Sequence, residues 1–205
     1  MSLAAEIPTA RDPVLVLASG SPRRRTLLAL AGFEFDVRAP GVDESPLPGE
    51  APDAMVLRLA IDKATAVAFA AGTDACVLAC DTTVVRDGSA LGKPTSIDDA
   101  AAMLLSLAGR SHEVVTGYAV RPPRHDRIER GIVKTVVTMR PISAAEAADY
   151  AASGEPLDKA GAYALQGEGG RFVERVDGSR SNVIGMPLET VVPLLERHGL
   201  VGRRP

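Results

Sequence analysis

Short apolar runs alternate along this chain with longer segments whose apolar residues recur at helical spacing. The runs predict strands at residues 14–18, 35–38, 76–79, 113–121, 128–139 and 172–176. Residues 82–85 continue the third strand, and Asp87-Gly88 after them is typical of a two-residue hairpin turn. A second, longer hairpin is expected at residues 122–126.

The segments of helical spacing predict helices at residues 22–31, 53–71, 97–107, 143–152 and 188–198. Ser143 and Glu146 form a capping-box pattern at the fourth helix, and Gly32 fits the end of the first. Residues 39–51 and 153–170 predict loops. Strands that alternate with helices indicate an α/β class, and the hairpins make its sheet mixed.

Composition narrows the class of protein. The 205 residues suit one domain, expected over residues 13–200 after a disordered lead-in at 1–12. A net charge of −3 argues against a protein that coats nucleic acid. No run reaches the length of a membrane span and no leader pattern opens the chain, so we expect a cytoplasmic protein. Cys76 and Cys80 fit buried small hydrophobes, and the cysteines and histidines give no zinc spacing.

The turn after the first strand concentrates groups suited to binding an anion. Ser21 and Pro22 fit the start of a helix, whose free amides and partial positive charge attract phosphate. Ser19 lies in the same turn, and Arg23 and Arg24 add formal charge there. The turn indicates a phosphate-binding segment, with a plain strand-to-helix turn carrying solvated arginines as the alternative.

Two other segments of the chain supply candidate site carboxylates. Asp81 follows the apolar run 77–80, so it is either a turn residue or a group aimed into a crevice, and Thr82 follows it. Glu44, in the proline-rich loop, can reach that crevice. Its neighbour Asp43 fits a site carboxylate and an ordinary solvated loop acid equally well. Two carboxylates beside a phosphate chain are typical ligands of Mg²⁺.

Three dispersed lysines complete the candidate set of charges. Lys63 falls on an apolar helical face, where it either extends along that face to the surface or points into a site. Lys93 follows the first hairpin, and Lys159 lies in the glycine-rich loop. With the two arginines they would neutralise a triphosphate if the fold brings them together. Gln166 offers an amide that pairs with O4 and N3–H of a pyrimidine, or equally with O6 and N1–H of guanine.

These motifs, taken in order, resemble the Maf-like nucleoside triphosphate pyrophosphatases from residue 14 to about 195. The matching segments are residues 18–24, 42–44, 63–64, 81–84, 92–94, 112–117, 154–163 and 178–188. The resemblance implies a mixed, twisted central sheet flanked by helices, with two lobes around a nucleotide cleft (Maf/ITPase-like). It also implies a homodimer that uses a divalent cation to hydrolyse a nucleoside triphosphate to the monophosphate and pyrophosphate.

The same resemblance assigns residues. Asp81 falls on the position of the proton acceptor, and Arg23, Thr82 and Gln166 match the specificity positions of the branch acting on dTTP and UTP. The branch acting on 7-methyl-GTP typically has a different residue in place of Lys159 and an acidic residue in place of Gln166. Thr83 is a small departure, because the dTTP/UTP branch often has Ile or Val at that position.

Our mechanistic hypothesis places Mg²⁺ or Mn²⁺ on Glu44 and Asp81, with water attacking the α-phosphorus and cations stabilising the leaving pyrophosphate. An ordinary aspartate pKa of about 3.9 is low for a general base. Either a metal acidifies the water and Asp81 orients it, or burial raises the pKa of Asp81. The alternatives to hydrolysis are a nucleotidyltransferase and a non-enzymatic regulator of cell division, and the substrate could also be a modified pyrimidine nucleotide.

Overall fold

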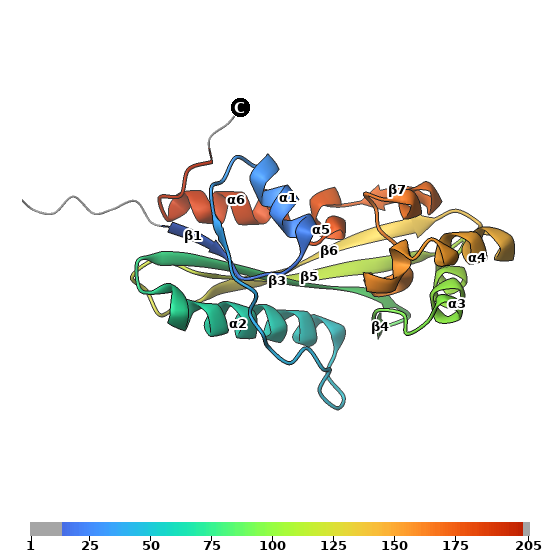
Figure 1. Ribbon diagram of the computed structural model, residues 1–205, viewed down its shortest axis with the longest axis horizontal. Coiled ribbons are helices and arrows are strands. Elements are labelled where there is room, and N and C mark those ends of the chain that lie inside the picture. The colour runs from blue at the N-terminus through green and yellow to red at the C-terminus, as the bar shows by residue number, and fades with distance from the viewer. Residues whose placement is uncertain (1–13, 203–205) are drawn as a thin grey trace, which may run out of the picture.

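The computed structural model describes residues 14–202, so the expected lead-in at 1–12 lies outside the described residues. A mixed sheet of seven strands runs the length of the molecule in the order β2-β1-β3-β5-β6-β7, with β4 paired to β3 (Figure 1). β1 is parallel to β2 and β3, and the other pairs are antiparallel. The predicted α/β class and mixed sheet are confirmed.

The strands lie close to their predicted positions. Their bounds are β1 Val14–Leu17, β2 Asp36–Val37, β3 Ala75–Arg86, β4 Ser89–Leu91, β5 Ser111–Arg121, β6 Glu129–Met139 and β7 Val173–Asp177. The two runs predicted at 76–79 and 82–85 form one strand, β3, which continues through Asp81. The second strand is shorter than predicted, because only residues 36 and 37 pair with β1.

The α-helices are α1 Pro22–Leu30, α2 Pro52–Ala71, α3 Ile97–Leu107, α4 Ala144–Ala152, α5 Arg180–Ile184 and α6 Leu188–Arg197. The capping box at Ser143 and Glu146 forms as predicted. Sequence spacing missed α5 and three short 3₁₀ helices, η1 Glu155–Asp158, η2 Ala160–Ala162 and η3 Glu168–Phe172. None of the described helices combines the length and apolar character needed to cross a membrane.

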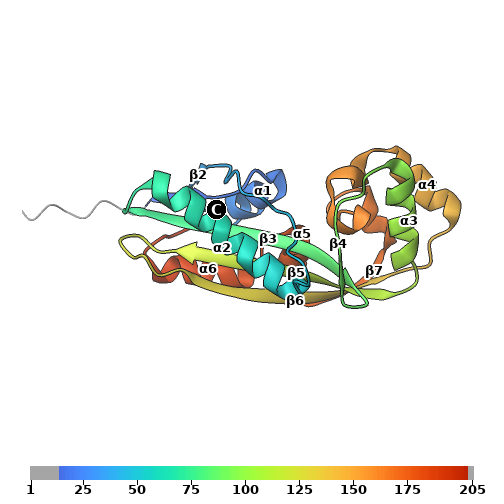
Figure 2. The same ribbon diagram turned by 90° about the horizontal axis from the view of Figure 1, so that it is seen from below.

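Two lobes share the central strands. In one lobe α2 covers one face of the sheet, while α1 and α6 cover the other (Figure 1). Figure 2 shows α3, α4 and the 3₁₀ segments gathered at the opposite end of the sheet. Tyr150, Tyr163 and Phe172 pack there against the ends of β3, β5 and β6. The lobes therefore meet beside the middle of β3.

Close packing of α2 on the sheet depends on Gly117 of β5. A Cβ atom at this position would lie 2.3 Å from the carbonyl oxygen of Val56 in α2. Gly117 also stands opposite Asp81 in the β3–β5 register. The missing side chain thus lets α2 approach the sheet beside Asp81.

Candidate active site

An interruption along one edge of β3 creates the site. β1 pairs with residues 75–78 of β3, and β4 pairs with residues 84–86 on the same edge. Among residues 14–202, no strand pairs with residues 79–83 on that edge, and the turn that follows β1 leads into the gap. Asp81 and Thr82 lie in this gap, and because side chains alternate along a strand they point to opposite faces of the sheet.

A cavity of about 400 Å³ occupies this gap. Its lining includes every residue selected from the sequence, namely Ser19, Ser21, Arg23, Arg24, Glu44, Lys63, Asp81, Thr82, Lys93, Lys159 and Gln166. These residues come from both lobes and span most of the chain. The spatial convergence predicted from the sequence is confirmed, while the chemical role of each residue stays a prediction.

Lys63 joins the two carboxylates of the cavity. Its Nζ lies 2.6 Å from Asp81 Oδ1 and 2.6 Å from Glu44 Oε1. Lys63 and Asp81 are buried, with 4% and 8% of their surface exposed, so the pair is well shielded from water. Of the two alternatives for Lys63, the one in which its side chain points into the site is confirmed. Glu44 Oε1 and Asp81 Oδ1 therefore lie at most twice this 2.6 Å distance from each other.

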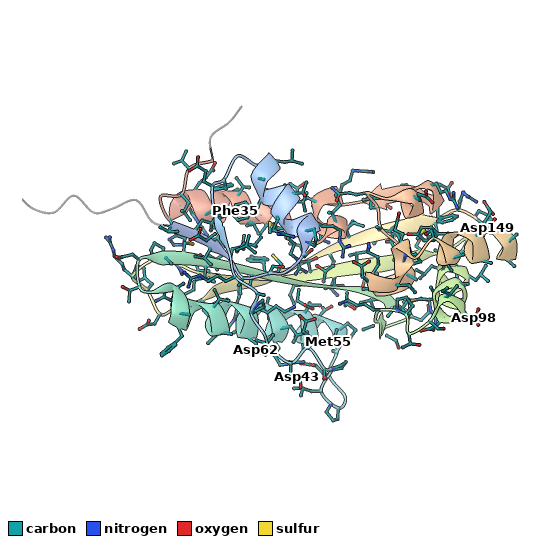
Figure 3. All side chains as sticks on the ribbon, viewed as in Figure 1. Phe35, Asp43, Met55, Asp62, Asp98 and Asp149 are labelled. Atoms are coloured by element: carbon teal, nitrogen blue, oxygen red, sulfur yellow. The ribbon has the colours of Figure 1, made fainter. Side chains whose placement is uncertain are left out.

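Glu44 responds electrostatically to its basic neighbours. Burial acts to raise its pKa, but the hydrogen bond and charge of Lys63, together with Lys93 and Arg24, lower the pKa of Glu44 below its ordinary value. Glu44 therefore stays a carboxylate at neutral pH. The adjacent Asp43 lies instead on the exposed loop that projects past α2 (Figure 3), where it accepts a hydrogen bond from the N–H of Ser45.

The start of α1 faces the cavity. Ser21 is the N-cap residue and Pro22 opens the helix as predicted, but no hydrogen bond from the first turn reaches the Ser21 side chain. The N–H of Ser21 donates instead to Ser19 Oγ at 3.2 Å. The amides of the first turn thus keep the capacity to bind an anion.

Arg24 ties together three walls of the cavity. Its guanidinium donates to the carbonyl of Gly185 at 2.8 Å, to Ser19 Oγ at 3.3 Å and to Thr82 Oγ1 at 3.2 Å. Thr82 in turn contacts Thr116 Oγ1 at 2.9 Å. Arg24 was predicted as a phosphate ligand, and these contacts give it a second task of holding the turn, β3 and α5 in place.

Further cations line the cavity, and two of them share one acidic partner. Arg23 Nη1 lies 3.6 Å from Asp158 Oδ2, and Lys159 Nζ also pairs with Asp158. Lys93 is exposed at the rim, and no acidic side chain of residues 14–202 forms an ion pair with it. Asp158 was missed as a site residue, although its place beside Lys159 was the available signal.

Tyr163 forms an apolar part of the cavity wall. Its hydroxyl lies 2.8 Å from Nε2 of the buried His112, and the two rings meet edge to face. Burial raises the pKa of Tyr163 and lowers that of His112 to about 4, so both groups are neutral at pH 7. Neither residue was selected from the sequence, because only the fold places them together.

The acidic residues fit a hard divalent cation only if other oxygens complete its shell. Glu44 and Asp81 present two carboxylates to one small space, which suits Mg²⁺ or Mn²⁺. Within residues 14–202 there is no group of three or more His, Cys, Asp or Glu side chains able to hold a metal. Phosphate oxygens of a substrate and water would have to supply the remaining ligands.

The two cysteines take no part in the site. Both are free and buried, as predicted, and burial raises the pKa of Cys76 to about 12 and that of Cys80 to about 11. Both thiols therefore stay protonated at neutral pH. They pack in the core beneath α1 and α6.

Comparison with known proteins finds similar sequences over most of the chain. The chain is 53% identical over 191 residues to a dTTP/UTP pyrophosphatase of Myxococcus xanthus, covering 93% of this chain and 95% of the relative. It is 50% identical over 186 residues to a protein of the same name from Geobacter sulfurreducens, covering 90% and 96%. A Desulfotalea psychrophila protein of that name is 44% identical over 190 residues, covering 93% and 97%. Residues 14–198 match the family model described as Maf-like protein, and the chain belongs to the Maf family.

Proposed function

We propose that this protein hydrolyses dTTP and UTP to the nucleoside monophosphate and pyrophosphate. The observation that carries the proposal is one cavity in which cations from both lobes surround the buried Lys63–Asp81 pair. A triphosphate needs such a cluster of positive charge, and hydrolysis needs an acidic group beside it. The names of the relatives support the choice of dTTP and UTP.

In this proposal the triphosphate replaces Asp158 as the ion-pair partner of two cations. Asp158 neutralises Arg23 and Lys159 in the free protein, and its side chain is 68% exposed at the mouth of the cavity. A triphosphate would take over these two cations and meet Lys93 at the rim. Charge accumulates on pyrophosphate as it leaves, so these cations stabilise the transition state more than the bound substrate.

Asp81 acts on the water that attacks the α-phosphorus. Its carboxylate is fixed by Lys63, and it accepts a hydrogen bond from the water and directs a lone pair toward phosphorus. The water oxygen bonds to the α-phosphorus and its proton passes to Asp81 or to solvent, while the bond between the α-phosphorus and its bridging oxygen breaks and the electron pair leaves with pyrophosphate. Glu44 and Asp81 would hold Mg²⁺ or Mn²⁺, and the ion would supply positive charge and lower the pKa of a bound water.

Gln166 reads the base. It lies exposed on the cavity wall, where its amide can donate to O4 and accept from N3–H of uracil or thymine. We expect Gln166→Glu to raise the KM for UTP and dTTP about tenfold, because the carboxylate repels O4. Steady-state kinetics measures this effect, and unchanged kinetics for both nucleotides would remove Gln166 as the base reader.

Three further properties belong to the proposal. The enzyme requires a divalent cation, assembles as a homodimer and works in the cytoplasm without a membrane or a stable nucleic-acid partner. Chelation followed by addition of Mg²⁺ or Mn²⁺ tests the first property, and light scattering tests the second. A chelated enzyme with full activity would contradict metal dependence.

A panel of nucleoside triphosphates, assayed for pyrophosphate release with metal and no acceptor, tests the reaction itself. We expect release from UTP and dTTP and at least tenfold less from ATP, GTP and CTP. Modified pyrimidine nucleotides belong in the panel as possible better substrates. A nucleotidyltransferase would be nearly silent in this assay, and silence with every nucleotide would overturn the proposal.

A further inference from the structure

Glu155, at the start of η1, is the centre of a hydrogen-bond network behind the base-reading loop, residues 164–169. Its Oε1 accepts a hydrogen bond from the Tyr150 hydroxyl at 2.8 Å and from the N–H of Gly169 at 3.2 Å. Its Oε2 accepts from the N–H of Glu168 at 3.1 Å. The loop that carries Gln166 is thus wrapped around a single carboxylate.

The glycines of this loop confirm how closely it approaches Glu155. A Cβ atom at Gly167, the residue after Gln166, would lie 2.2 Å from Glu155 Oε1. One at Gly169 would lie 2.4 Å from the Tyr150 hydroxyl. The carboxylate and the hydroxyl approach the loop more closely than a Cβ atom would allow, so the loop packs directly against both groups.

Glu155 also contacts the phosphate side of the cavity through its backbone. Lys159 Nζ donates to the carbonyl oxygen of Glu155 at 3.0 Å. The carboxylate is half-buried, and its three donors hold it ionised: burial acts to raise the pKa of Glu155, but hydrogen bonds from Tyr150, Gly169 and Glu168 lower it below its ordinary value. Hydrogen bonds to a charged acceptor are stronger than neutral ones.

We infer that Glu155 is a positioning residue, whose carboxylate fixes the base-reading loop so that Gln166 meets the nucleobase. The inference rests on the proposed function for the identity of the ligand. It separates two tasks in one cavity, because the carboxylate of Glu155 serves the base side and leaves Asp81, Lys63 and Arg23 untouched.

The test is Glu155→Gln, which keeps the size of the side chain but places an amide against two N–H donors. We expect the KM for UTP and the inhibition constant of UMP to rise about tenfold. We expect kcat to change less than threefold and the inhibition constant of pyrophosphate to stay unchanged. Glu174→Gln, an equal change of charge on exposed β7, is the matched control and should behave as wild type.

Tyr150→Phe is the second variant and should shift the same constants in the same direction. Hydrogen exchange of residues 166–170 in the ligand-free protein gives a readout that does not depend on the substrate, and Glu155→Gln should accelerate it. Unaltered exchange would overturn the inference even if UTP proves not to be the substrate. A parallel rise in the inhibition constant of pyrophosphate would also overturn it, since the whole cavity would then have been disturbed.

Discussion

At the scale of single residues, the ion pair between Asp81 and Lys63 is the feature on which the chemistry depends. We expect Asp81→Asn to lower kcat at least 100-fold at fixed metal concentration, because the amide cannot accept a proton or hold a cation as the carboxylate does. Asp43→Asn is the matched control, since that exposed carboxylate only caps a turn at Ser45. Near-normal turnover of Asp81→Asn would remove Asp81 from both roles.

His112 links protein stability to pH. Its pKa is about 4 in the folded protein and near 6.5 when unfolded, so between these values the unfolded chain binds more protons. The stability from neutral His112 is complete above pH 6.5 and is lost as the pH falls toward 4, by on the order of 3 kcal/mol.

Urea unfolding at pH 7.5, 6 and 5 measures this dependence. His112→Gln should be less stable than wild type at pH 7.5, because its contact with Tyr163 is altered, but should lose less stability on acidification. An equal loss in both proteins over this range would assign the pH dependence to other groups.

Residue chemistry was the part most accessible from the sequence. Asp81 was selected because it follows an apolar run, Arg23 because it lies in the turn that opens the first helix, and Lys159 because it adds charge in the glycine-rich loop. Their partners were not accessible, since Asp158 and Glu155 are ordinary acids until the fold places them beside cations and amides. The double use of Arg24 was likewise hidden, because Gly185 lies 161 residues away from it in the chain.

At the scale of elements, the closeness of α2 to the sheet sets the position of Lys63. We expect Gly117→Ala to destabilise the protein by about 2–4 kcal/mol, since its Cβ would meet rigid backbone of α2. Displacement of α2 would also move Lys63 from Asp81 and lower kcat. Thermal unfolding and UTP kinetics measure the two effects.

Gly131→Ala is the control for this prediction. Gly131 is also a sheet glycine, but its Cβ would meet the tip of the Tyr118 side chain, 2.5 Å away, which can move. A smaller loss of stability and unchanged kcat are expected. Equal effects of the two substitutions would show that α2 does not depend on Gly117 for its position.

Hydrophobic periodicity identified the long elements well. The helix predicted at 97–107 begins and ends as predicted, and Ser96 caps it by accepting from the N–H of Asp99. The segment 153–170 was predicted only as a loop, because η1, η2 and η3 have three to five residues each and show no repeating apolar pattern. That segment carries the second wall of the cavity, so its shape could not be predicted.

At the scale of the whole molecule, a basic cavity lies within a chain of net charge −3. We expect the KM for UTP to rise several-fold between 50 and 500 mM KCl at constant Mg²⁺, because salt screens the cations that attract the triphosphate. The value of kcat should change little. A KM indifferent to salt would show that charge attraction contributes little to binding.

Sequence order could indicate an α/β molecule but could not specify where the two lobes join. β3 contributes Cys76, Leu78 and Cys80 to the core of one lobe and Val84 to that of the other. β5 does the same with Val120 and Val114. The lobes are therefore built on continuous strands, and the turn, the proline-rich loop and the 3₁₀ segments add the walls.

Continuous strands leave no hinge. Two bodies joined by a flexible tether can rotate toward each other around a ligand, but here such rotation would have to bend the paired ladders of β3, β5 and β6. The spacing between opposing walls is consequently set when the chain folds rather than when a nucleotide arrives. Selectivity among nucleotides therefore depends on a cavity of fixed width, which only the small segments attached to the strands can adjust.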